Sequence, residues 1–109
     1  MSKIINHDAQ STIDLLAVKT FVSSATNKRL SNIVNVSRII ITNKTASVAT
    51  VSLYIRLDAS PNTEYYLIKN LDIPAEVAWV WDEEFNFNNA THALKIQQHT
   101  DTDLSIIIK

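Results

Sequence analysis

The chain has 109 residues, a net charge of −1 and a hydrophobic share of 46%, which fit one globular domain and argue against global disorder. Its ten Lys and Arg residues are scattered along the chain, so the clustered basic surface typical of nucleic-acid binding is not expected. The absence of cysteine excludes disulfides and thiolate metal sites. The sequence contains neither a signal-peptide core nor a run of about eighteen apolar residues, so we expect no contact with a membrane.

Glycine is absent, although average usage would predict about eight. This excludes the glycine-rich loops that cradle phosphates. Asparagine is among the residues that best tolerate positive φ after glycine, and asparagines stand where turns are expected, at positions 43, 62, 70, 86, 88 and 89. A codon bias toward Asn, Ile and Lys would produce the same composition, so both explanations stay open.

The chain begins with a polar stretch that contains an isolated Ile4–Ile5 pair and has no clear period. We expect residues 1–10 to form a flexible arm that becomes ordered on a neighbouring subunit, and residues 11–109 to form one β-domain. Residues 12–25 allow a helix over 13–19, whereas their Thr, Val, Phe and Ser content favours one or two strands.

The most informative stretch is residues 37–57, in which two apolar runs flank a polar break at residues 43–47. In the second run, aliphatic side chains alternate with polar or amphipathic ones, which predicts a strand with one buried face. The β-branched run at residues 39–41 predicts a more fully covered strand. We therefore expect an antiparallel hairpin at the centre of the domain.

The rest of the chain continues as short apolar segments separated by turn residues. Strong turn chemistry at residues 58–63 precedes further expected strands at 64–69, 77–81, 92–99 and 104–109, of which the last two are predicted to form a hairpin. Between the expected strands at 77–81 and 92–99, Phe85 and Phe87 alternate with asparagines. About seven to eight short strands at this spacing predict an all-β fold, a single antiparallel β-sandwich of the jelly-roll or immunoglobulin-like kind.

No residue pattern predicts a reaction. The acids at 82–84, and the pair Asp101 and Asp103, could act as catalytic carboxylates or calcium ligands, but they lack the spacing of either. The three histidines lack metal-site spacing, and a nucleophile elbow needs glycine. We therefore expect a non-enzymatic protein without catalytic residues, metal ligands or cofactors.

Trp79 and Trp81 share one face of their expected strand, where they could stack on sugars or anchor a protein interface. Alternatively, one or both fill the core. The tyrosines could add amphipathic contacts or pack at the core edge. The candidate interface residues are Ile4, Ile5, Tyr54, Tyr66, Trp79 and Trp81.

Three segments carry a family resemblance: IIITNKTASVATVSLYI, then EYYLIKNLDIPAEVAWVWD, then LKIQQHTDTDLSIII. Their order over residues 39–109 resembles small virion structural proteins of tailed bacteriophages, although the glycines often found near the Pro74–Ala75 turn are missing. The resemblance implies a compact β-sandwich that decorates or cements the capsid shell by binding the major capsid protein or other virion proteins. It also implies a homo-oligomer or multicopy assembly, made in the host cytoplasm and located in the virion. Composition and hydropathy, as described above, predict no nucleic-acid or membrane partner.

Two other functions stay open. The first is a neck or tail accessory protein of the virion. The second belongs to a different class, a carbohydrate-binding β-sandwich module that uses Trp79 and Trp81 as its stacking platform.

Overall fold

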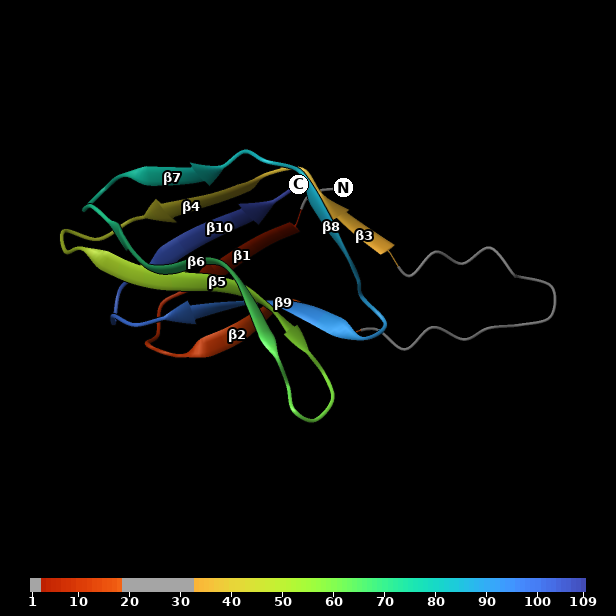
Figure 1. Ribbon diagram of the computed structural model, residues 1–109. Helices are drawn as coiled ribbons and strands as arrows, with labels where there is room; N and C mark the ends of the chain where they lie inside the picture. Colours follow the sequence, from red (N-terminus) through yellow and green to blue (C-terminus); the bar gives the residue numbers. More distant parts are fainter. Residues whose placement is uncertain (1–2, 19–32) are drawn as a thin grey trace, which may run out of the picture.

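The computed structural model describes residues 3–18 and 33–109, and within these ranges the chain consists of strands and turns (Figure 1). The ten strands are β1 (Lys3–His7), β2 (Thr12–Leu16), β3 (Ile33–Val36), β4 (Ile39–Asn43), β5 (Ala49–Leu57), β6 (Glu64–Ile73), β7 (Ala78–Trp81), β8 (Phe85–Asn88), β9 (His92–Gln98) and β10 (Leu104–Ile108). The all-β prediction is confirmed for these residues, although the expected number of strands was too low. No described segment is a helix able to cross a membrane.

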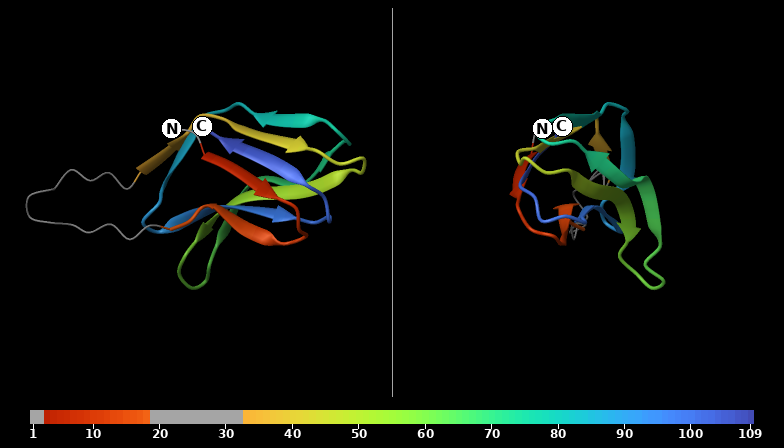
Figure 2. Two further views of the ribbon diagram at one scale, coloured as in Figure 1. Left: turned by 180° about the vertical axis from the view of Figure 1, so that it is seen from behind. Right: turned by 90° about the vertical axis from the view of Figure 1, so that its left-hand side faces the viewer.

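The strands form two four-stranded antiparallel sheets and one small pair. The first sheet has the order β1-β10-β4-β7, and the second has the order β2-β9-β5-β6. The view from behind shows the four strands of the first sheet side by side (Figure 2). Strands β3 and β8 pair with each other and contribute Val36 and Phe87 to the core.

The pairing is nested along the chain. Strand β1 pairs with β10, β2 with β9, β3 with β8, β4 with β7, and β5 with β6. The described strands therefore form one long antiparallel ribbon with its tip at residues 58–63. Two further ladders, β10 with β4 and β5 with β9, join the ribbon into the two sheets.

Both predicted hairpins are wrong, because the strands that follow each other in the chain lie in different sheets. Strand β4 belongs to the first sheet and β5 to the second, and β9 and β10 are divided in the same way. The polar segments 44–48 and 99–103 carry the chain from one sheet to the other. Strands β4, β5, β9 and β10 still bury aliphatic side chains, because both sheets contribute to the same core.

The core consists of the aliphatic side chains that the alternating pattern places on one face of each strand. Residues of both sheets belong to it and are essentially inaccessible to solvent: Ile39, Ile41, Val51, Leu53, Leu94, Ile96, Leu104 and Ile106. This explains why the strands could be located from their alternation, whichever strand each one pairs with.

Asparagine takes over positions where glycine would be usual. Asn62 and Asn70 both have φ of 55°. Asn62 lies in the turn after β5, as predicted, whereas Asn70 lies within β6, where the prediction of a turn is wrong. Asn43 has another role, because it is a fully buried residue at the end of β4. Glu76, in the turn between β6 and β7, has φ of 60° and was not anticipated.

The beginning of the chain is part of the first sheet. Residues 3–7, which we expected within a flexible arm, pair with β10 along their whole length. Ile5 lies opposite Ile106 and packs against the core, whereas Ile4 lies opposite Ile107 on the outer face. The alternation of a strand thus separates the two isoleucines.

Candidate functional site

The outer face of the first sheet carries a row of aliphatic side chains. Ile4 of β1 lies beside Ile107 of β10, Ile107 beside Ile40 of β4, and Ile40 beside Val80 of β7. We call these four residues the aliphatic row. It crosses every strand of the sheet, and solvent-facing positions of an antiparallel sheet are usually polar.

The row arises from two runs of three isoleucines, at residues 39–41 and 106–108. In each run the outer two side chains are buried, so the middle one must point to the opposite face. Ile40 and Ile107, on the inner strands, are half-buried by their neighbours. Ile4 and Val80, on the edge strands, are 75% and 48% exposed. Exposed aliphatic side chains that lie side by side mark contact surfaces more often than scattered ones.

Polar side chains border the row on both sides. On one side lie Asn6, Ser105 and Thr42, and the small Ala78 continues this line on β7. On the other side, Arg38 Nε donates to Asp82 Oδ1 at 3.0 Å. An apolar centre with a polar rim is the usual anatomy of a protein interface. The exposed Arg38–Asp82 pair adds at most about 1 kcal/mol to stability, so a partner could replace it at little cost.

Trp79 and Trp81 lie on the inner side of β7, opposite the fully buried Ile41 and Ile39. Both rings are half-buried and pack against the core, with their centroids 6.2 Å apart. The indole Nε1–H of Trp81 donates to the carbonyl of Glu83 at 2.8 Å. This placement corresponds to the core alternative rather than to an open stacking platform.

Tyr54 and Tyr66 lie on the outer face of the second sheet, with ring centroids 5.0 Å apart. Tyr54 is almost fully buried and Tyr66 is exposed. The hydroxyl of Tyr66 donates to Glu64 Oε1 at 3.1 Å, and the Lys69 ammonium lies 5.1 Å from the ring centroid. Partial burial raises the pKa of Tyr66 above its ordinary value, and the Glu64 carboxylate adds to this by its hydrogen bond and its charge.

The six residues singled out from the sequence therefore lie on three different surfaces. Ile4 is on the outer face of the first sheet, Ile5 and the two tryptophans face the core, and the two tyrosines are on the outer face of the second sheet. Sequence reasoning missed Ile40, Ile107 and Val80. The two isoleucine triplets were the available signal, because a strand cannot bury three consecutive side chains on one face.

One contact resembles a hydrolase dyad. Ser52 Oγ lies 2.9 Å from His99 Nε2 and also accepts a hydrogen bond from the backbone N–H of Asn70 at 2.9 Å. Ser52 is only 1% exposed, so a substrate cannot reach its oxygen. The contact instead links β5 to β6 and to the end of β9.

The acids and histidines lie apart from one another. The side chains of Asp82, Glu83 and Glu84 are exposed, and Asp103 pairs with Lys44 at 3.4 Å. Within residues 3–18 and 33–109, no three His, Asp or Glu side chains converge as a metal site would require.

Of the described surface, the aliphatic row with its polar rim is the part best suited to contact another protein. A comparison of the chain with protein-family models, curated proteins and solved structures returned no match.

Proposed function

We propose that this chain is a non-enzymatic phage virion structural protein that decorates or cements the capsid shell, and that its fold is a β-sandwich of the jelly-roll kind. The nested pairing supports the fold, because a jelly roll is a double sheet of eight strands, an architecture shared by viral capsid and lectin domains. In the immunoglobulin-like alternative the first two strands are neighbours. Here β1 and β2 lie in different sheets and β1 pairs with β10.

The observation that carries the function is the aliphatic row. Covering a half-exposed aliphatic side chain contributes about 1 kcal/mol, so the four residues together provide several kcal/mol. Association costs about 4 kcal/mol or more, so one such contact is weak by itself. Many copies bound to a symmetric shell would gain avidity without stronger individual contacts. A multicopy protein on the major capsid protein is therefore a suitable user of this surface.

The two other functions draw less support from the described residues. A neck or tail accessory role would use the same surface on a different virion partner. A carbohydrate platform at Trp79 and Trp81 requires open ring faces, whereas both rings are half-buried against the core. The placement of the tryptophans does not favour that function.

The test is cosedimentation of the purified protein with capsids of the virus that encodes it, prepared without this protein. We expect the wild-type chain to pellet with the capsids, and Ile4→Lys and Val80→Lys to reduce the bound fraction about tenfold, since each removes apolar contact and places a charge in the interface. Thr12→Lys and Gln97→Lys, on the outer face of the second sheet, are the matched controls and should bind as wild type does.

Circular dichroism and a denaturation midpoint should show that all four variants fold. Failure of the wild-type chain to bind heads would refute the cement role, and binding to isolated tails would support the accessory role in its place. Equal binding of the row variants and their controls would show that the aliphatic row is not the contact surface.

A further inference from the structure

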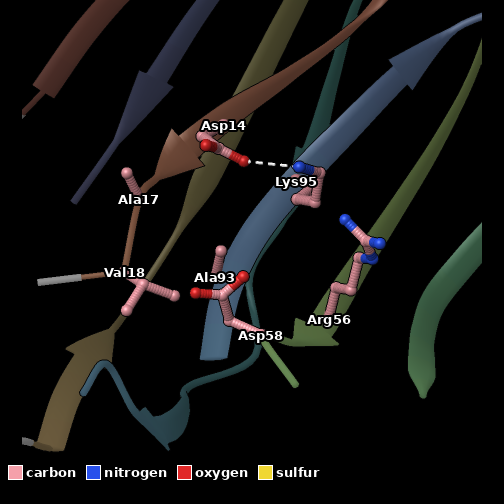
Figure 3. A pocket seen from close by; sticks show the side chains of 7 residues that line it. All are labelled: Asp14, Ala17, Val18, Arg56, Asp58, Ala93 and Lys95. Carbon is pink, nitrogen blue, oxygen red and sulfur yellow. Dashed lines mark hydrogen bonds and ion pairs between the residues drawn. The ribbon is translucent and has the colours of Figure 1, made fainter. Parts of the chain in front are cut away.

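A separate pocket lies on the outer face of the second sheet, where β5 ends and β9 begins. Its volume is about 240 Å³. Figure 3 shows the carboxylates of Asp14 and Asp58 on two walls, the Arg56 and Lys95 nitrogens on a third, and Ala17 with Val18 on the remaining side. The volume is somewhat below that of pockets for drug-sized ligands, which begin at about 300 Å³, so the pocket suits a smaller molecule.

The pocket exists because a small residue occupies its floor. Ala93 lies beside Arg56 in the register of β9 and β5, and the next outward residue of β9 is Lys95, beside Tyr54. The methyl group of Ala93 leaves open the volume that a longer side chain would fill. Substitution at this one position can therefore close the pocket without altering its charges.

Hydrogen bonds hold the walls in place. Lys95 Nζ lies 2.7 Å from Asp14 Oδ1. The buried Asn89 donates through Nδ2 to the carbonyl of Ala17 at 3.0 Å, and the backbone N–H of Asp58 donates to the carbonyl of Thr91 at 2.8 Å. Both contacts run to the turn between β8 and β9, so this turn positions two parts of the pocket wall. A site that is already ordered loses little entropy when a ligand binds.

Two charged groups in the pocket are left without a partner. Lys95 and Asp14 neutralise each other. Within the part of the chain that the structure describes, the guanidinium of Arg56 and the carboxylate of Asp58 take part in no ion pair or side-chain hydrogen bond. In Figure 3 the two groups point to different sides of the cavity rather than toward each other. Among its described residues the pocket thus offers one free cation and one free anion at separate positions.

We propose that this pocket binds a small zwitterion, a free α-amino acid, whose carboxylate contacts Arg56 and whose ammonium group contacts Asp58. A guanidinium matches a carboxylate through two parallel hydrogen bonds. A simple anion would meet repulsion from the unpaired Asp58, and a simple cation would meet repulsion from the unpaired Arg56. A sugar is a poorer match, because no aromatic side chain is among the described residues of the lining.

The test is a titration of the full chain with glycine, L-serine and L-valine. Binding is monitored through the backbone amide and Arg Nε–H signals in NMR spectra. Acetate and methylammonium serve as half-ligands. We expect saturable shifts at Arg56, Asp58 and Ala93 with at least one amino acid, and affinities about tenfold lower for either half-ligand, because each forms one of the two charged contacts.

Variants then locate the site. Arg56→Gln and Asp58→Asn should each weaken binding about tenfold, Ala93→Leu should abolish it, and the smaller Ala93→Ser should keep it. Arg38→Gln, on the outer face of the first sheet, is the matched control and should bind as wild type does. A denaturation midpoint close to that of the wild type shows that a variant is folded.

Absence of binding by all three amino acids, equal affinity for the half-ligands, or binding that survives Ala93→Leu would overturn the proposal. The pocket and the aliphatic row lie on different sheets, so the two proposals fail independently. Loss of capsid binding leaves the titration unaffected, and absence of amino-acid binding leaves the capsid assay unaffected.

Discussion

Asn43 shows how one buried amide replaces the contacts that a tight turn would supply. Its side chain is inaccessible to solvent, and Nδ2 donates to the carbonyls of Ser47 at 2.6 Å and Ile73 at 3.1 Å. Its Oδ1 accepts from the backbone N–H of Thr45 at 3.0 Å. The amide thereby connects the segment that crosses from β4 to β5 with the end of β6.

Replacing Asn43 by alanine should lower the free energy of unfolding by about 3 kcal/mol, because buried carbonyl and N–H groups lose their partner while remaining out of water. Urea denaturation followed by tryptophan fluorescence measures the effect. Asn35→Ala, at an exposed position of β3, is the control and should change stability by no more than about 0.5 kcal/mol. Equal effects of the two substitutions would show that the buried hydrogen bonds of Asn43 do not contribute to the free energy of unfolding.

The turn residues were partly predictable from the sequence. A chain without glycine must place other residues at positive φ, and asparagine fills this role at positions 62 and 70. Glu76 could not have been anticipated, because glutamate has no special tolerance for this conformation. Asn43 was expected in a turn, but its hydrogen bonds depend on β6, which is distant in the sequence.

At the scale of a single element, β1 separates two identical side chains by the face on which they lie. Ile5 packs on the core opposite Ile106, and Ile4 is the first member of the aliphatic row. From the sequence the two residues are equivalent neighbours. Only the pairing with β10 distinguishes a residue that stabilises the fold from one that is available to a partner.

Ile5→Ala should therefore lower the free energy of unfolding by about 2 kcal/mol, whereas Ile4→Ala should change it by no more than about 0.5 kcal/mol. Guanidinium denaturation of both variants measures the difference, and capsid cosedimentation should show the opposite order of effects. If both substitutions were equally mild in denaturation, β1 would not be packed on the core in solution.

The strands themselves were largely predictable, because the alternation of aliphatic and polar side chains is a local property. Residues 49–57 follow that alternation throughout, and residues 94–97 follow it within β9, whereas β4 and β10 were indicated by their β-branched isoleucine runs. Their partners were not predictable, since any strand with one aliphatic face can pair with any other. Adjacent strands in a chain are often neighbours in a sheet, and this preference led to the two wrong hairpins. The aliphatic row could not be predicted for the same reason, because its four residues become neighbours only when β1, β10, β4 and β7 pair in the observed register.

At the scale of the whole molecule, the nested ribbon makes most contacts distant in the sequence. The ladder of β5 and β6 closes only the short loop at residues 58–63, whereas the ladder of β1 and β10 joins Lys3 to Ile108. Closing a longer loop costs more chain entropy, so folding that begins at the tip of the ribbon loses the least entropy. Folds dominated by distant contacts form in about milliseconds to seconds.

Folding kinetics should reflect this order. Ile68 lies on β6 and packs against the core. The folding φ-value, which measures how far a residue's contacts are formed in the transition state, should be about 0.5 or more for Ile68→Ala and below about 0.3 for Ile5→Ala. Stopped-flow chevron plots of the wild type and the two variants measure both values. The reverse ranking would mean that the ends of the ribbon associate before its tip.

The ladder of β1 and β10 also places Lys3 beside Ile108, far from the tip at residues 58–63 (Figure 1). A short linker could therefore join β10 to β1, and new termini opened at the tip would interrupt none of the ladders. Such a circular permutant would carry a fused peptide or cargo on the side of the second sheet. The face that we assign to capsid contact would stay uncovered.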